Sequence, residues 1–408
     1  MDFTLINQIQ VLPFDTASTE GKNLLYYNDQ YFEVSAPLAE LLKTIQELGC
    51  LSKAAIHFSH QTGKTYSEED VTAIVEKFIT PIFQKETEKP SKNKTFIFKV
   101  GLLPPQSVKT IATRLRFFLQ PKIALFFLLL ILTCEILFFT SDLGVIHSLS
   151  GANGYIIVGV LGLFVMSSLF HEMGHAAACR YFNAENGGVG FGLYISFPVF
   201  YTDVTNIWRL TRKQRIIVNF SGVYFQLLFL LPFFVIYFLT GDNIPKLFIY
   251  TINLNFLFTL NPFFKFDGYW IMSDLMGVPN LRSRSMEYFT YLFQKLRKKE
   301  ASKPFLLSLR PMERFAMIAY SLVVNIFFLY FFVFVIPRII YNFNFFYNFF
   351  SLFPRNASHI VNNLAQGIWP GTSLIVNSIF QVVMFGFIVL FLYKMLIKLI
   401  KGLQPKNI

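Results

Sequence analysis

Long apolar runs follow residue 120, whereas the first 90 residues mix apolar and polar positions with turn residues. Several of these runs approach the roughly 20 residues that a helix needs to cross a bilayer. The pattern predicts a polytopic α-helical membrane protein whose domain of about six transmembrane helices covers residues 122–400. We place the spans at about residues 122–140, 155–181, 216–240, 247–266, 313–337 and 374–397.

The first 90 residues are expected to form a small winged-helix-like α+β domain. Two apolar segments, residues 24–27 and 31–34, flank the polar residues 28–30 and indicate a β-hairpin. Residues 91–121 begin within the Lys-, Glu- and Asn-rich stretch 84–95 and carry Arg114 and Arg116 near their end. We therefore expect them to form a linker and an interfacial segment before the first span.

Three short helices are expected after the hairpin. Ser35 is placed to begin an amphipathic helix that Gly49 ends. A second helix covers about residues 52–60. Ser67 and the acidic residues after it have the spacing of a capping box, which predicts the start of the third helix.

The distribution of basic residues predicts how the spans are oriented. The chain has 36 Lys and Arg against 24 Asp and Glu. Segments 180–215 and 280–314 and the C-terminal tail are rich in basic residues, whereas segment 141–154 has none. Because cytoplasmic segments carry the excess of Lys and Arg, both termini and the N-terminal domain are predicted to be cytoplasmic. No basic stripe with interleaved aromatic residues is present, so nucleic acid is not expected as a partner.

The second predicted span contains ionisable residues, which are costly in an apolar setting and mark function by default. His171 and His175 lie four residues apart, so on a helix they share one face and can bind one ion. Glu172, beside them, can accept a proton from a water molecule. The pattern H-E-x-x-H is the signature of zinc hydrolases. The alternative is a pair of histidines that pack against polar neighbours.

A catalytic zinc ion usually has three protein ligands, so a third is expected. Asp267 follows the fourth predicted span, where Pro262 breaks the helix and Gly268 permits a tight turn. His171 lies about 14 Å of helix before the cytoplasmic end of its span. The predicted topology brings Asp267 to the same side of the membrane. The alternatives are an Asp267 that pairs with a nearby basic residue, and a closed structural site with Cys179 as a further ligand.

These motifs resemble those of the site-2 protease family of intramembrane zinc metalloproteases, and more closely the bacterial peptide zinc metalloproteases of YydH type. HEMGH is followed by N-P-x-x-K-F-D-G-Y at residues 261–269. The resemblance implies Zn²⁺ as the cofactor, with ligands His171, His175 and Asp267 and with Glu172 as the catalytic base. It also suggests that Asn261 holds the substrate or the oxyanion. Gln226 stands where many members of the family have an asparagine, and is expected to replace it.

The N-terminal domain is similar to the PqqD-like elements that recognise the leader segments of ribosomally made peptides. The similarity implies that residues 24–48 bind a leader peptide, which would add a strand to the hairpin. A plain structural domain is the alternative. The glycine-rich residues 187–195 are expected either to form a re-entrant strand that pairs with the substrate or to form an ordinary turn.

Together, the motifs predict an intramembrane zinc metalloprotease of the bacterial cell membrane that cleaves a ribosomally synthesised peptide precursor during maturation or export. The expected partners are that precursor, the lipid bilayer and a peptide exporter. Two alternatives stay open. In the first, the substrate of the protease is a membrane-bound regulator. In the second, the protein is a non-catalytic zinc-containing protein that binds or escorts a peptide.

Overall fold

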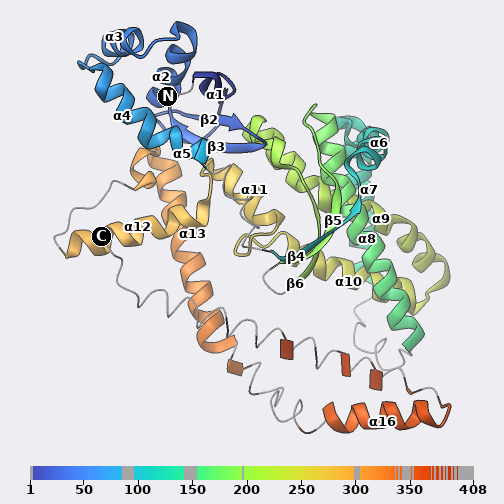
Figure 1. The fold of residues 1–408 in the computed structure, drawn as a ribbon. Helices are drawn as coiled ribbons and strands as arrows, with labels where there is room; N and C mark the ends of the chain where they lie inside the picture. Colours follow the sequence, from blue (N-terminus) through green and yellow to red (C-terminus); the bar gives the residue numbers. More distant parts are fainter. Residues whose placement is uncertain are drawn as a thin grey trace.

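The computed structural model describes residues 3–84, 96–141, 154–194, 197–297, 304–335 and 353–368, with isolated positions between 337 and 393. Within these residues the chain is mostly helical and contains two three-stranded antiparallel sheets. Figure 1 shows the N-terminal domain at one end of the molecule and the second sheet, β4 to β6, beside helices α8 and α9.

The first sheet contains the predicted hairpin and one strand that was not predicted. Asn28 and Asp29 form the turn with positive φ angles of 46° and 56°, and the next residue, Gln30, pairs with Tyr27. A two-residue turn with both φ angles positive matches the twist of a hairpin. The strands, in the spatial order β1-β2-β3, are β1 Gln10–Pro13, β2 Lys22–Tyr27 and β3 Gln30–Ser35.

The helices of the N-terminal domain begin and end close to the predicted residues. Gly49 and Gly63 end two of them in the left-handed conformation, which glycine adopts without strain. Ser67 and Asp70 form the predicted capping box, and hydrogen bonds from Ser67 lower the pKa of the Asp70 carboxyl. Ser35 precedes its helix without a side-chain cap. The helices are α1 Phe3–Asn7, α2 Ala36–Leu48, α3 Leu51–Thr62, α4 Glu68–Phe78 and α5 Thr80–Gln84.

The second sheet changes two expectations. Residues 96–103, which we assigned to the linker and interfacial segment, instead form an edge strand. The glycine-rich segment does form a strand, but it is the central one, and both of its edges pair within the chain. It therefore cannot pair with a substrate as expected. The strands are β4 Phe96–Leu103, β5 Val189–Tyr194 and β6 Phe197–Thr202.

Three helices of the described residues are long and apolar enough to cross a membrane. They correspond to the first, third and fifth predicted spans, which supports an association with the membrane. These segments are α7 Pro121–Ser141, α9 Arg212–Thr240, and Pro311–Val335, which consists of α13 Pro311–Tyr330 and a π-helical turn.

The other predicted spans have different outcomes. The second forms the 28-residue helix α8 Gly154–Tyr181. The fourth was placed too long, because α10 Asn243–Thr259 has 17 residues and ends before Pro262. Proline lacks a backbone donor and restricts the residue before it, so a helix commonly ends at this point. The sixth, at 374–397, lies mostly outside the described residues. The six-span arrangement stays a prediction.

Helices α8 and α9 form the centre of the largest hydrophobic cluster, with α7 and α10 packed around them. Its fully buried members include Phe138, Phe225, Phe234 and Phe248. The remaining helices are α6 Pro105–Leu115, α11 Asp267–Met276, α12 Leu281–Leu296 and α16 Phe353–Ala365.

A buried ion pair joins α9 to α11. The Nε of Arg215 donates to the Oδ1 of Asp274 at 2.7 Å, and the two side chains are 3% and 10% exposed. Another guanidinium nitrogen of Arg215 donates to the main-chain oxygen of Asp15 at 3.1 Å. Asp15 also accepts two hydrogen bonds from Arg212. The segment after β1 is thus tied to the start of α9 and, through Arg215, to α11.

We expect Arg215→Ala to destabilise the protein strongly. Removal of the guanidinium leaves the Asp274 carboxylate buried without its partner, which typically costs about 3–5 kcal/mol. Arg284→Ala is the control, because this residue forms a more exposed pair with Glu33 and Glu287 and should cost about 1 kcal/mol or less. Denaturant unfolding of the purified chain in detergent measures both losses. Equal, small losses of unfolding free energy in the two variants would contradict the structural role of the Arg215–Asp274 ion pair.

Candidate metal centre

Two histidines on one face of α8 direct the same ring nitrogen to a common point. The Nε2 atoms of His171 and His175 lie 3.2 Å apart. The other nitrogen of His175, Nδ1, lies 2.8 Å from the main-chain oxygen of Val218 on α9. Because a carbonyl only accepts, Nδ1 carries the hydrogen, and Nε2 of the neutral ring presents a lone pair. This is the tautomer that a metal ligand requires.

Asp267 completes the group from a different helix. Its Oδ2 lies 3.0 Å from the Nε2 of His171 and 3.3 Å from the Nε2 of His175. Among the described residues these three form a group of potential metal donors, with all three atoms within 4.8 Å of one another. The sequence argument had placed the two motifs on the same side of the membrane, and the structure brings them into contact distance.

The start of α11 places the Asp267 carboxylate. Asn261 shapes the loop between α10 and α11, since its Oδ1 accepts from the main-chain N–H of Phe263 at 2.8 Å. We expected Gly268 to permit a tight turn. This expectation was wrong, because Gly268 lies within helix α11 and does not have a positive φ angle. Any side chain there would collide with the main chain of Leu260. A glycine at 268 therefore lets α11 begin against the end of the preceding segment.

The donor set fits Zn²⁺. A tetrahedral ion with bonds of about 2.0–2.1 Å holds its ligand atoms about 3.3–3.4 Å apart, and the three observed separations lie near this value. With its Nδ1 protonated, His175 contributes a lone pair that faces a carboxylate oxygen. Such an arrangement of acceptors is stabilised by a cation and is unfavourable without one. Nitrogen from imidazole and oxygen from carboxylate are both common ligands of zinc.

Helix α9 covers one side of the metal centre with its main chain. A Cβ atom at Gly222 would lie 2.7 Å from the Nε2 of His171 and closer still to that of His175. A Cβ atom at Gly174 would lie 2.9 Å from the Cβ of Phe225 and would also meet the main chain of Ser221. Glycine at these two positions lets α8 and α9 approach closely enough to enclose the donor atoms.

Glu172 lies beside the donors but is not one of the three. The residue is 8% exposed. Its main-chain oxygen accepts a hydrogen bond from the Oγ1 of Thr202 at 3.1 Å, which connects α8 to the end of β6. The second sheet therefore lies against the helical turn that carries the histidines.

Asn261, Gln226 and Cys179, which the sequence suggested as further site residues, lie in three different environments. The Oδ1 of Asn261 accepts a hydrogen bond within its own loop, and its amide nitrogen is the group that can donate to a ligand. Gln226 is 2% exposed, one helical turn after Gly222, and its Oε1 has no hydrogen-bond partner within the described residues. Cys179 is fully buried but is not part of the described donor group.

Sequence reasoning missed three contributors to the site: Val218, which fixes the tautomer of His175, Thr202, and Gly222 as the close-approach residue. A glycine in the interior of an otherwise apolar helix is a usable signal, because it weakens the helix unless close packing requires it. Val218 gives no signal, since it contributes only a main-chain oxygen.

The fold and site define a helical protein with apolar helices able to cross a membrane and with a candidate metal triad. Comparison with curated proteins finds a Bacillus subtilis (strain 168) protein, YydH, provisionally named a peptide zinc metalloprotease protein, that is 28% identical over 118 residues. The aligned part covers 28% of this chain and 46% of YydH, less than half of that relative. This similarity indicates a related family. No family model matches the chain, and no solved structure matches it.

We expect Gly222→Ala to reduce the zinc affinity of the purified chain by at least about 10-fold, the scale on which neighbours of metal ligands act. The added methyl group would occupy space beside both Nε2 atoms. Gly162→Ala is the matched control, because it lies in α8 with open space around the position. Chelator competition measures both affinities. Wild-type affinity in Gly222→Ala would contradict the described geometry.

Proposed function

We propose that the protein is a membrane-embedded zinc metalloprotease that hydrolyses a peptide bond in a ribosomally synthesised peptide precursor. The observation that carries the proposal is the convergence of His171, His175 and Asp267 beside Glu172. The similarity to YydH supports the broader class of metalloproteases. The apolar helices support a location in a membrane, which we propose is the bacterial cell membrane, with both termini cytoplasmic.

In this proposal the two histidines and Asp267 hold Zn²⁺, which polarises the scissile carbonyl and makes water more acidic. Glu172 accepts the proton of the attacking water and passes it to the leaving amine. The hydrogen bond from Nδ1 of His175 to Val218 keeps the lone pair of Nε2 available for the metal. The amide nitrogen of Asn261 would donate a hydrogen bond to the substrate or the oxyanion.

The second sheet offers a place for an extended substrate. Strand β6 lies at the edge of the sheet within the described residues, and its last residue, Thr202, contacts the main chain of Glu172. A peptide bond is accessible to water only when its backbone is not folded into a helix. We propose that the substrate pairs with β6, which replaces our expectation for the central strand β5.

Glu172→Gln should leave the zinc content unchanged and abolish cleavage, because the amide cannot accept the proton from water. A loss of at least about 100-fold in rate is expected from the usual contribution of general-base catalysis. Mass spectrometry of a candidate ribosomally made peptide precursor, incubated with the purified chain, measures the cleavage. Cleavage at the wild-type rate by Glu172→Gln would overturn the assignment of the base.

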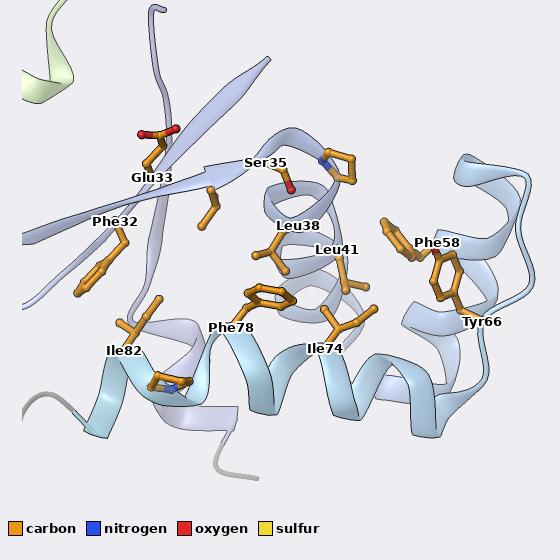
Figure 2. Close-up of a pocket in the computed structure, with 13 residues that line it drawn as sticks. Phe32, Glu33, Ser35, Leu38, Leu41, Phe58, Tyr66, Ile74, Phe78 and Ile82 are labelled. Carbon is orange, nitrogen blue, oxygen red and sulfur yellow. The ribbon is translucent and has the colours of Figure 1, made fainter. Parts of the chain in front are cut away.

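A groove in the N-terminal domain supports the proposed leader peptide binding. It has a volume of about 500 Å³ and lies between β3 and helices α2, α3, α4 and α5. Figure 2 shows Leu38, Leu41, Ile74 and Phe78 directed toward its middle. Strand β3 is an edge of the first sheet within the described residues. A peptide added to this edge can place apolar side chains in the groove.

We expect Phe78→Ala to weaken binding of the uncleaved precursor by about 10-fold, the loss that accompanies about 1.4 kcal/mol. Phe78 lines the groove and is 50% exposed. Ile56→Ala is the control, because this residue is 61% exposed and does not line the groove. Fluorescence polarisation with Glu172→Gln as the common background separates binding from cleavage. Equal affinities for both variants would remove the N-terminal groove from the proposal.

The two alternative functions predict different outcomes of the cleavage experiment. A membrane-bound regulator as substrate predicts cleavage of a membrane protein and no cleavage of a peptide precursor. A peptide escort protein predicts binding without cleavage by the wild-type chain. The candidate site favours catalysis, because the described donor group has three protein residues and contains no cysteine, as in zinc sites with a fourth position for water.

A further inference from the structure

Apart from the metal-facing Oδ2 of Asp267, three buried polar atoms at the metal centre have no hydrogen-bond partner within the described residues. They are the Oγ of Ser167, the Nδ1 of His171 and the Oε1 of Gln226. Ser167 is fully buried and Gln226 is 2% exposed. Buried polar groups are nearly always paired, so three such atoms near one site require an explanation.

The antiparallel register of α8 against α9 indicates that the three atoms lie in adjacent layers. The two helices run antiparallel: His175 contacts the main chain of Val218, and His171 faces Gly222, four residues further along α9. We infer from this register that the next step of four residues on each helix brings Ser167 opposite Gln226. Phe170 packs against Phe225 and Phe229, which confirms the same direction of packing.

His171 differs from His175 in one respect that matters for a metal ligand. His175 donates its Nδ1 hydrogen to Val218, whereas the Nδ1 of His171 has no such protein partner among the described residues. Histidines that bind metals almost always donate their second N–H, which fixes both the tautomer and the orientation of the ring. An acceptor beyond Nδ1 is therefore needed to direct the Nε2 lone pair of His171 toward the metal.

We propose that Ser167 and Gln226 form a positioning site for His171 through one shared water molecule. The water accepts from the Nδ1–H of His171 and donates to the Oε1 of Gln226 and the Oγ of Ser167. Three polar partners are what a buried water typically has. The inference rests on the proposed metal centre. It assigns Gln226 to positioning the metal ligand His171, whereas we had expected Gln226 to contact the substrate or the oxyanion.

The two side chains also select the tautomer. In this proposal the water donates one hydrogen to the Oε1 of Gln226, which only accepts, and the other to the Oγ of Ser167, so that an oxygen lone pair faces His171. This arrangement favours the Nδ1–H tautomer of His171. The other tautomer would direct a hydrogen from Nε2 into the space between His175 and Asp267, where the cation binds.

Zinc affinity tests this role independently of catalysis. In purified full-length protein, Gln226→Leu removes the acceptor at similar size, and Ser167→Ala removes one partner with little change in volume. We expect the zinc dissociation constant, from chelator competition, to rise about 10- to 100-fold for Gln226→Leu and less for Ser167→Ala. Gln226→Glu keeps an acceptor and should restore the affinity to within about threefold of wild type, which a purely structural role for the amide does not predict.

Ser321→Ala is the matched control, since Ser321 is 2% exposed but bonds to its own helix on α13. Its zinc affinity should equal that of the wild type. The visible spectrum of the Co²⁺-substituted protein provides a second readout, and Gln226→Leu should shift its bands through the altered orientation of His171.

Wild-type zinc affinity and an unchanged Co²⁺ spectrum in Gln226→Leu would overturn the positioning role while leaving the proposed protease intact. An equal loss in Gln226→Glu and Gln226→Leu would also overturn it. A wild-type chain that binds no zinc would instead refute the proposed function, and the positioning role with it.

Discussion

The close approach of α8 and α9 is the constraint on which the candidate site depends. Gly174 faces the main chain of Ser221, and Gly222 faces the rings of His171 and His175, so neither glycine places a side chain of its own at these two close contacts. Direct packing of helix backbones through small residues is a common way to hold helices together in a membrane. Here it also places a main-chain oxygen of α9 on one histidine and leaves room for an ion beside both.

A second constraint brings the carboxylate to this helix pair. Gly268 lets α11 start against Leu260, and Arg215 holds the same helix to α9 through Asp274, two turns after Asp267. Arg215 also binds the main chain of Asp15, which belongs to the segment after β1. The third donor and the connection to the N-terminal domain are therefore fixed by the same buried charge. A change at Arg215 should affect both folding and the position of Asp267.

The parts of the molecule that sequence reasoning predicted are those encoded by local patterns. The spacing of His171 and His175, the turn at residues 28–29 and the capping box at Ser67 each depend on a few neighbouring residues. Asp267 was predicted because carboxylates are rare in apolar surroundings and few donors were available. Its distance from the histidines, however, depends on Gly268 and on packing between separate helices, which no local pattern specifies.

Two features were missed for different reasons. Strand β4 pairs with β5 across more than 80 residues of sequence, so its local composition suggested only an interfacial segment. Glu135 in the first apolar helix accepts a hydrogen bond from Asn253 on α10 at 3.1 Å, and it was overlooked although an acid in such a helix is a strong signal. This bond joins α7 to α10. Long-range pairing of this kind becomes visible only when the helices are placed together.

The zinc content of the purified full-length protein, measured by mass spectrometry of the metal, tests the central claim most directly when wild type is compared with Asp267→Ala. The account predicts one zinc ion per wild-type chain and a marked loss of zinc in Asp267→Ala, because two imidazoles alone leave the described donor group incomplete. A wild-type chain without zinc, or an Asp267→Ala chain with unchanged zinc content and affinity, would contradict it.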